Sequence, residues 1–265
     1  MGILERNNVR VIGDHGPVIV YAHGFGCNQT MWHRVTPAFE RTHRQVLFDY
    51  VGSGQSDISA FDPARYSELA GYAEDVLEIC DELGFTDGIR FVGHSVSSSI
   101  GLLASIERPE LFNKLLLLGP SPCFLNDPPE YMGGFERADL EGLLSLMERN
   151  FIGWATYLAP AVTGESPDSP VTKELTTSFC STEPSTIKVF AEATFFADIR
   201  AVLSKVTRPS LILQHRNDAL APVSVGQYLN NQLSGSTLTI LEVAGHSAHM
   251  THPSLVIEAM REFFG

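Results

Sequence analysis

One serine in the first half of the chain has the surroundings of a catalytic nucleophile. It is Ser95 in Gly93-His-Ser-Val-Ser97, between an apolar run at residues 88–92 and a helix-like run at residues 97–106. A serine hydroxyl is a weak nucleophile at neutral pH, so enzymes present it at a sharp strand-to-helix turn beside a base and backbone N–H groups. Gly93 allows strand and helix to approach closely, and Ser97 replaces the second glycine of the usual Gly-x-Ser-x-Gly pattern. The segment predicts a nucleophilic Ser95, and a serine that merely begins a helix is the alternative.

An acid and a base follow Ser95 in the order that such a nucleophile requires. Residues 209–214 are typical of a short buried strand, and the polar residues after them predict a loop that carries Asp218. Residues 237–242 are typical of a last strand, and the next loop carries His246. Where nucleophile, acid and base occur in this order, acid and base lie on loops after later strands. We therefore predict a triad of Ser95, Asp218 and His246 that would transfer an acyl group through Ser95 and then to water.

Several other side chains could compete for these roles. His249 and His252 lie close to His246, but His246 directly follows the last predicted strand. His94 is expected to pack under the turn at Ser95, and His23 to shape a neighbouring loop. Cys27 lies beside that loop but lacks a strand-to-helix turn, so we do not expect it to be the nucleophile.

A glycine-rich loop predicts the site that stabilises negative charge on the attacked carbonyl oxygen. His23-Gly-Phe-Gly26 follows the strand predicted at residues 18–22. Backbone N–H groups in such a loop, together with that of the residue after the nucleophile, form an oxyanion hole. The sequence predicts the Phe25 and Val96 N–H groups as the two donors, and a glycine turn without a catalytic role is the alternative.

Composition limits the functions that this chain can have. It has 265 residues, of which 44% are hydrophobic, which is enough for one well-buried catalytic domain. A formal net charge of −13 disfavours a nucleic-acid partner, which would need clustered lysine and arginine. The sequence shows neither a signal-peptide pattern nor a long apolar run, so we expect no membrane span. Four scattered cysteines suit a reducing cytoplasm and show no metal-ligand spacing, and the predicted chemistry needs no cofactor.

Apolar periodicity predicts the α/β class, with a mostly parallel central sheet that is covered by helices on both faces. The predicted strands are residues 9–12, 18–22, 45–49, 89–92, 114–118, 211–214 and 238–242, and helices are predicted at 67–83 and 254–264, among others. The alternation fails between 121 and 200, where several helices are expected instead. We therefore predict a core domain of residues 1–120 and 201–265, and a helical lid of residues 121–200 inserted over the active site.

The predicted lid is rich in aromatic residues, which indicates a dry, apolar pocket above Ser95. Such a pocket suits a mostly hydrophobic small molecule rather than a sugar or a phosphate ester. The segment Asp49-Tyr-Val-Gly-Ser-Gly-Gln-Ser-Asp57 also has spaced glycines, but it matches neither a P-loop nor a dinucleotide fingerprint. We interpret it as a structural turn.

With these elements in place, the chain resembles the α/β-hydrolase superfamily over nearly its full length. The resemblance is closest to the RsbQ type, bacterial regulators of an energy-stress sigma factor, and to the plant karrikin and strigolactone receptors of the same branch. It is carried by segments such as His23-Gly-Phe-Gly26, Phe48-Asp-Tyr-Val-Gly-Ser-Gly54, Arg108-Pro-Glu-Leu-Phe112, Gly153-Trp-Ala-Thr156 and the long segment 119–135. The Gly-His-Ser-Val-Ser spelling is characteristic of this branch.

The resemblance implies the same triad and the same oxyanion donors. It further implies an α/β-hydrolase fold and a serine hydrolase that acts on a hydrophobic ester or lactone, since the plant members bind and slowly cleave butenolides. An RsbQ-like protein would act in stress signalling with a PAS-domain serine phosphatase as its partner. A metabolic carboxylesterase or lactonase, and a receptor with little turnover, are the alternatives. We expect the ligand pocket to be lined by Phe124, Trp154, Leu158, Phe195 and Phe196.

Overall fold

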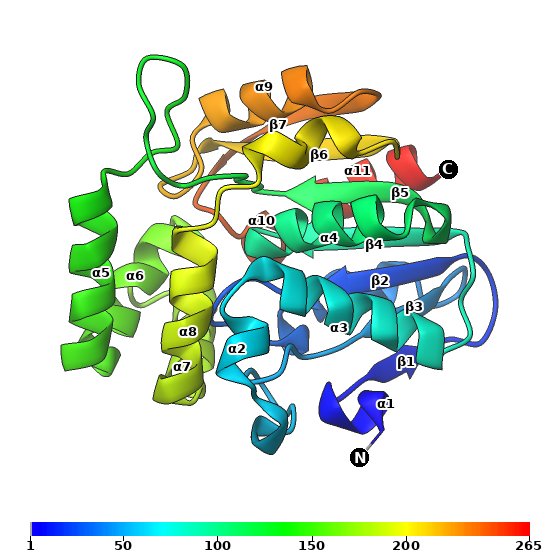
Figure 1. The fold of residues 1–265 in the computed structure, drawn as a ribbon, viewed down its shortest axis with the longest axis horizontal. Helices are drawn as coiled ribbons and strands as arrows, with labels where there is room; N and C mark the ends of the chain where they lie inside the picture. Colours follow the sequence, from blue (N-terminus) through cyan, green and yellow to red (C-terminus); the bar gives the residue numbers. More distant parts are fainter. Residues whose placement is uncertain (1) are drawn as a thin grey trace.

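A seven-stranded sheet forms the centre of the molecule, with strand order β1-β3-β2-β4-β5-β6-β7. The computed structural model describes residues 2–265 (Figure 1). The strands are β1 (Arg10–Ile12), β2 (Val18–Ala22), β3 (Arg44–Leu47), β4 (Ile89–His94), β5 (Phe112–Leu118), β6 (Ser210–Asn217) and β7 (Ser236–Ala244). Only β1 runs antiparallel to its neighbour β3, and every other pairing is parallel. The predicted α/β class and the mostly parallel sheet are confirmed.

Both faces of the sheet are buried, which explains why its central strands are almost continuously apolar. In β5, Leu115 and Leu117 enter one hydrophobic core, and Leu116 and Leu118 enter the other. Helices α3 (Leu69–Glu82), α4 (Val96–Glu107) and α9 (Val223–Gln232) contribute to the first core. Helix α11 (Pro253–Phe264) and the 3-10 helix η1 (Gln29–Trp32) contribute to the second. The remaining short elements are α1 (Ile3–Arg6), α2 (Pro63–Tyr66), α10 (Ala248–Thr251), η2 (Thr36–Ala38), η3 (Ile58–Ala60), η4 (Pro109–Leu111) and η5 (Arg200–Lys205).

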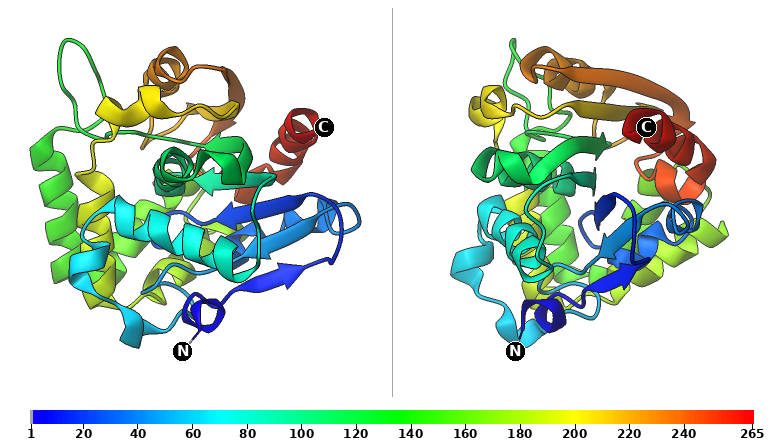
Figure 2. Two further views of the ribbon diagram at one scale, coloured as in Figure 1. Left: turned by 45° about the vertical axis from the view of Figure 1, so that its right-hand side comes forward. Right: turned by 90° about the vertical axis from the view of Figure 1, so that its right-hand side faces the viewer.

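Four helices between β5 and β6 in the chain lie beside the sheet, beyond the carboxyl ends of its parallel strands (Figures 1 and 2). They are α5 (Arg137–Arg149), α6 (Phe151–Thr163), α7 (Pro170–Cys180) and α8 (Pro184–Phe195), and we call them the inserted helices. The segment that leads into them, residues 121–136, is an irregular loop without helix. The structure therefore places the inserted helices within a narrower range than the helical region predicted from the sequence.

Local signals explain where the inserted helices begin and end. Helix α5 begins with a capping box between Glu136 and Asp139, and the side chain of Asn150 accepts a hydrogen bond at the start of α6. Helix α6 ends at Gly164, which adopts the left-handed conformation that favours glycine. Ser169 caps α7 through the Thr172 N–H group. Within residues 2–265, no helix combines the length and the apolar character that a membrane crossing would need.

Several predicted strand boundaries differ from the structure by one to three residues, including the ends of β6 and β3. Strand β6 continues through His215 to Asn217, which the sequence predicted as loop, because its backbone stays paired with β7 as far as Ala244. Strand β3 ends at Leu47, before the predicted end at Asp49. The carboxylate of Asp49 instead accepts hydrogen bonds from the Gln29 and Gln55 N–H groups, so it holds two loops together. Residues 49–57 form the turns that we interpreted from the sequence.

Candidate active site

Ser95 lies at the turn between β4 and α4, in a backbone conformation that few side chains adopt. Its φ is 57° and its ψ −122°, and its N–H group donates to the Leu118 carbonyl at 2.8 Å. A Cβ at Gly93 would lie 2.5 Å from the Ser97 carbonyl oxygen and 2.8 Å from the Ser98 nitrogen, both of which are backbone atoms. Only glycine fits there, as the sequence pattern predicted.

Ser97 has a bonding role that explains why it can replace the usual glycine. Its hydroxyl is fully buried and donates to the carbonyl oxygen of His23, in the loop after β2. The Tyr50 hydroxyl lies 2.9 Å from the Ser97 Oγ and donates to it, because the Ser97 hydroxyl hydrogen is used on His23. Ser97 therefore ties the first turn of α4 to the glycine-rich loop that faces Ser95.

Asp218 and His246 meet although different strands carry them. Asp218 follows β6, His246 follows β7, and the His246 Nδ1 lies 2.7 Å from the Asp218 Oδ2. The other carboxylate oxygen, Oδ1, accepts from the Leu220 N–H at 2.9 Å and from the Ala221 N–H at 3.1 Å. The carboxylate is thus held in one orientation, which fixes the imidazole so that its Nδ1–H donates to Asp218.

A second histidine, which the sequence did not single out, bonds to the same carboxylate oxygen. The His215 Nδ1 lies 3.0 Å from the Asp218 Oδ2, and His215 is fully buried. Burial of Asp218 would raise its pKa, but the neighbouring His246 and the hydrogen bonds from His215 and His246 outweigh it, so the pKa lies below its ordinary value. Asp218 is therefore ionised at neutral pH, as the acid of a triad should be.

His246 lines the same cavity as Ser95, and one of its ring nitrogens is free. Because Nδ1 donates to Asp218, Nε2 carries the lone pair, and it has no hydrogen-bond partner within residues 2–265. Ser95 and His246 both line a small cavity under the inserted helices. A base with an unoccupied lone pair beside a serine hydroxyl is the arrangement that activates the serine.

The two predicted oxyanion donors are available. Val96 is the first residue of α4, so its N–H has no acceptor inside the helix, and Phe25 lies in the loop after β2. Neither N–H group donates to another atom among the described residues. Phe25 lines the cavity, and Val96 directly follows Ser95, which also lines it. Free N–H groups at these positions can receive the negative charge of a tetrahedral intermediate.

The other histidines near the site have structural contacts. The His94 Nε2–H donates to the His246 carbonyl oxygen at 2.9 Å, and burial lowers its pKa well below the ordinary value. His23 accepts from the Tyr50 N–H through Nε2, and its Nδ1–H donates to the Gly24 carbonyl. His249 is buried behind His94, with ring centroids 4.4 Å apart, and His252 is exposed. Burial raises the pKa of the Cys27 thiol to about 12, so a nucleophilic thiolate is disfavoured there.

The cavity over Ser95 is apolar and small, with a volume of about 30 Å³. Of the five predicted pocket residues, Phe124, Leu158 and Phe195 line it, together with Phe25, Phe179 and Leu220. Trp154 lies in a second layer, where its ring packs 6.0 Å from Phe25 and 5.2 Å from Phe179 between centroids. Phe196 lies outside: it lines a separate surface groove, and the Arg137 guanidinium covers its ring.

The side chains of His215, Asp218 and His246 also form the one cluster in residues 2–265 whose ligand atoms could surround a metal ion. The two N···O separations in this cluster, 2.7 and 3.0 Å, are hydrogen-bond distances. The cluster consists of the same atoms that bond Asp218 to His215 and His246, so we interpret it as a hydrogen-bonded network.

The chain is similar to known proteins that share the fold described above. The family model described as alpha/beta hydrolase fold matches residues 17–253, which is most of the chain. The chain belongs to this family. A strigolactone esterase of Pisum sativum is 41% identical to this α/β-hydrolase over 254 residues, which cover 95% of the chain and 94% of the relative. A karrikin insensitive 2 receptor of Petunia hybrida is 37% identical over 262 residues, covering 98% and 96%.

Solved structures agree with the fold of this α/β-hydrolase. A hydrolase from Oleispira antarctica superimposes with a TM-score of 0.96 and is 45% identical, and the match covers 99% of this chain and 96% of the other. The relatives of this chain thus include proteins named as esterases, as hydrolases and as receptors.

Proposed function

We propose that this α/β-hydrolase is a serine hydrolase that cleaves hydrophobic esters or lactones, including butenolide-like lactones. The observation that carries the proposal is the site itself: a strained Ser95, an imidazole nitrogen without a partner, and an ionised, fully oriented Asp218. A chain in which Ser95 merely began a helix would have no reason to hold a buried acid and base beside it.

The proposed reaction follows from this arrangement. The His246 Nε2 takes the proton from the Ser95 hydroxyl as its oxygen attacks the substrate carbonyl, and the Phe25 and Val96 N–H groups hold the oxyanion. Asp218 stabilises the resulting imidazolium, which then protonates the leaving alcohol. Water, activated by the same imidazole, hydrolyses the acyl-enzyme and releases the acid. In a lactone the alcohol and the acid stay joined in one product.

The lining of the cavity supports an uncharged, apolar substrate. Phenylalanine and leucine side chains surround Ser95, and no side chain that lines the cavity carries a formal positive charge for a phosphate or carboxylate. The name of the pea relative, an esterase, supports ester chemistry.

Ligand-dependent signalling with slow hydrolysis is the second candidate, because relatives that match almost the whole chain are named as receptors. The sequence resemblance to the RsbQ type supports a stress-signalling form of this candidate, with a PAS-domain serine phosphatase as the partner. Capture of such a phosphatase by the purified protein, in a manner that depends on the ligand, supports this candidate. Rapid turnover of a defined ester without a partner supports a metabolic esterase instead.

The decisive experiment compares the parent protein with Ser95→Ala. We expect the variant to lose at least about 10³-fold in kcat on 4-nitrophenyl acetate. Intact-mass spectrometry after incubation with a butenolide probe should show an adduct on the parent only. Ser105→Ala is a matched control, since Ser105 is buried like Ser95 but lies inside α4, where its hydroxyl bonds only to the Leu102 carbonyl. Equal activity of parent and Ser95→Ala would refute the assignment.

A further inference from the structure

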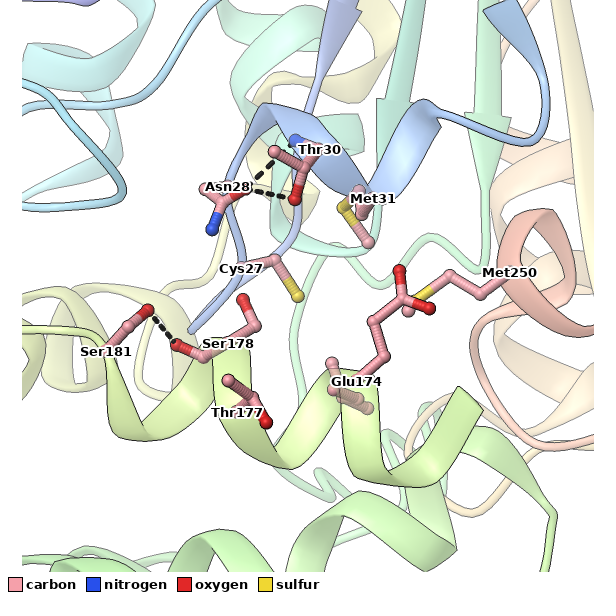
Figure 3. Close-up of a pocket in the computed structure, with 10 residues that line it drawn as sticks. Cys27, Asn28, Thr30, Met31, Glu174, Thr177, Ser178, Ser181 and Met250 are labelled. Carbon is pink, nitrogen blue, oxygen red and sulfur yellow. Dashed lines mark hydrogen bonds between the residues drawn. The ribbon is translucent and has the colours of Figure 1, made fainter. Parts of the chain in front are cut away.

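A second pocket, with a volume of about 290 Å³, lies behind one wall of the cavity over Ser95. Figure 3 shows it between the segment that follows β2, helix α7 and Met250. Its residues are Cys27, Asn28, Thr30, Met31, Glu174, Leu175, Thr177, Ser178, Ser181 and Met250, and we call it the outer pocket. It is about ten times larger than the cavity over Ser95, whose volume is about 30 Å³.

The segment after β2 and helix α7 each contribute residues to both spaces. In the segment after β2, Phe25 lines the inner cavity and Met31 the outer pocket, while Cys27 lines both. On α7, Phe179 lines the inner cavity and Leu175 the outer pocket. The two spaces therefore adjoin at Cys27, which lines both.

The chain beyond β7 shows the same division. His246 lines the inner cavity, and Met250, four residues later, lines the outer pocket. The catalytic base and a wall of the outer pocket thus belong to one short segment of chain.

Few polar contacts hold the boundary between the two spaces. Cys27 is a small side chain, and burial keeps its thiol neutral by raising its pKa to about 12. Helix α7 meets this part of the core through the Ser178 hydroxyl, which donates to the Gly26 carbonyl at 3.3 Å, and through the ring of Phe179 against the Gly26 backbone.

The lining of the outer pocket indicates what kind of group it can take. Its floor is buried and apolar, formed by Cys27, Met31, Leu175 and Met250, and methionine side chains adapt to groups of different shape. Its rim carries exposed hydroxyl groups. The one acidic side chain, Glu174, is already paired with the Arg34 guanidinium at 2.7 Å. This lining suits an uncharged, mainly apolar group.

We propose that the outer pocket is a second subsite of the active site. It binds the larger of the two groups that flank the substrate carbonyl, an uncharged aryl or alkyl group, while the inner cavity holds the carbonyl and the smaller group over Ser95, and the substrate passes between them when the Cys27 side chain at their boundary moves aside. This inference rests on the proposed hydrolase function. It follows from the sizes: a cavity of about 30 Å³ holds little more than the reacting carbonyl and its small substituent, and ligand pockets in proteins usually reach about 300 Å³ or more.

Tryptophan at the rim tests the subsite without touching the catalytic residues. Thr177 is exposed, lines the outer pocket and bonds back to the Lys173 carbonyl at 2.8 Å. Thr156 on α6 is a matched control, because it is also exposed, bonds back to the Ile152 carbonyl at 2.8 Å and lines neither space. The substrates are ethyl acetate, 2-naphthyl acetate and ethyl 3-phenylpropanoate, of which the last two enlarge the alcohol side or the acyl side.

We expect Thr177→Trp to lower kcat/KM for at least one of the two large esters by about tenfold or more, as expected when a ring is excluded from a pocket. The kcat/KM of Thr177→Trp for ethyl acetate should stay within about twofold of the parent value. The same should hold for Thr156→Trp with all three substrates. Cys27→Ala, which thins the wall, should raise kcat/KM for the same large ester. If the two tryptophan variants behave alike on both large esters, the outer pocket is no subsite.

A binding measurement separates this inference from the proposed function. The probe is 2-acetylnaphthalene, a ketone that cannot be hydrolysed, titrated calorimetrically into Ser95→Ala protein. Binding that is weakened about tenfold by an added Thr177→Trp supports the subsite even if the parent hydrolyses no ester, in which case the proposed function fails alone. Ester turnover by the parent with no binding of the ketone, or with binding that Thr177→Trp leaves unchanged, overturns the subsite alone.

Discussion

At the scale of single residues, Asp218 is the most tightly held group in the candidate site. It accepts from two imidazoles through Oδ2 and from two backbone N–H groups through Oδ1. A carboxylate that is bonded in this way has one orientation available, so the His246 ring that depends on it also has one. His215 contributes one of these bonds without facing the substrate.

We predict that His215 matters to catalysis as a positioning residue. His215→Phe removes the bond to Asp218, and a hydrogen bond to a charged group contributes about 1.5 kcal/mol or more, which corresponds to about tenfold in rate. We expect kcat to fall about tenfold with KM nearly unchanged, while His215→Gln, whose amide can still donate, recovers most of it. Steady-state kinetics at pH 8 measures both. Equal kcat for parent and His215→Phe would show that His215 only fills space.

At the scale of elements, the ends of parallel strands gather the site. Ser95, Asp218 and His246 follow β4, β6 and β7, and the oxyanion loop follows β2, so residues distant in sequence meet at one edge of the sheet. The turn between β4 and α4 is the tightest of these junctions. A side chain at Gly93 would collide with backbone atoms of α4, which cannot rotate away.

We predict opposite effects for two glycine-to-alanine changes. Gly93→Ala should lower the melting temperature and abolish turnover, because its Cβ would lie 2.5 Å from the Ser97 carbonyl oxygen. Gly142→Ala in α5 has nothing within 4 Å of its new Cβ, so it should stabilise the helix by up to about 1 kcal/mol. Thermal unfolding and the esterase assay measure both. A stable, active Gly93→Ala protein would contradict the close approach of β4 and α4 at this turn.

The same strand ends explain what the sequence could predict. Strand periodicity located the loops that carry Asp218 and His246, because loops after parallel strands share one edge of the sheet. His215 was missed, since β6 runs past its apolar part and stays paired with β7 on backbone hydrogen bonds that side-chain patterns do not record. A histidine three residues before the predicted acid was the one available signal.

The side chains that line the cavity were harder to predict than the strand ends that carry Asp218 and His246. Aromatic residues in a helical segment predict burial, but which ring faces Ser95 depends on how the helices pack. Trp154 therefore lies behind the cavity wall and Phe196 outside it, although the sequence analysis expected both to line the pocket together with Phe195. The volume of the cavity likewise depends on rotamers and packing, which no residue pattern encodes.

At the scale of the whole molecule, buried neutral histidines couple stability to pH. Burial is the main cause that lowers the pKa values of His23, His94, His215 and His249 below the ordinary value. In the unfolded chain these groups bind protons near pH 6.5, whereas in the native protein they do so only at lower pH. The unfolded state therefore binds more protons as the pH falls below about 6.5, and the free energy of unfolding decreases there, by up to about 1.4 kcal/mol per pH unit for each histidine.

We predict that His249→Phe weakens this acid sensitivity. Both ring nitrogens of His249 are buried and have no hydrogen-bond partner among residues 2–265, and the ring centroid lies 4.6 Å from that of Trp32, so phenylalanine should replace it without losing a hydrogen bond. The difference in the free energy of unfolding between variant and parent should grow in favour of the variant from pH 7.5 to pH 5.0. Urea denaturation at several pH values gives this difference. Parallel curves for the two proteins would exclude His249 as a contributor.

The strained backbone conformation of Ser95 lowers the stability of the native state. Its φ of 57° costs an L-residue roughly 1–2 kcal/mol, and glycine avoids this cost. Ser95→Gly should therefore melt at a higher temperature than Ser95→Ala, although neither can form an acyl-enzyme. A serine at a position where glycine would be free of strain is expected if Ser95 is the nucleophile that we propose.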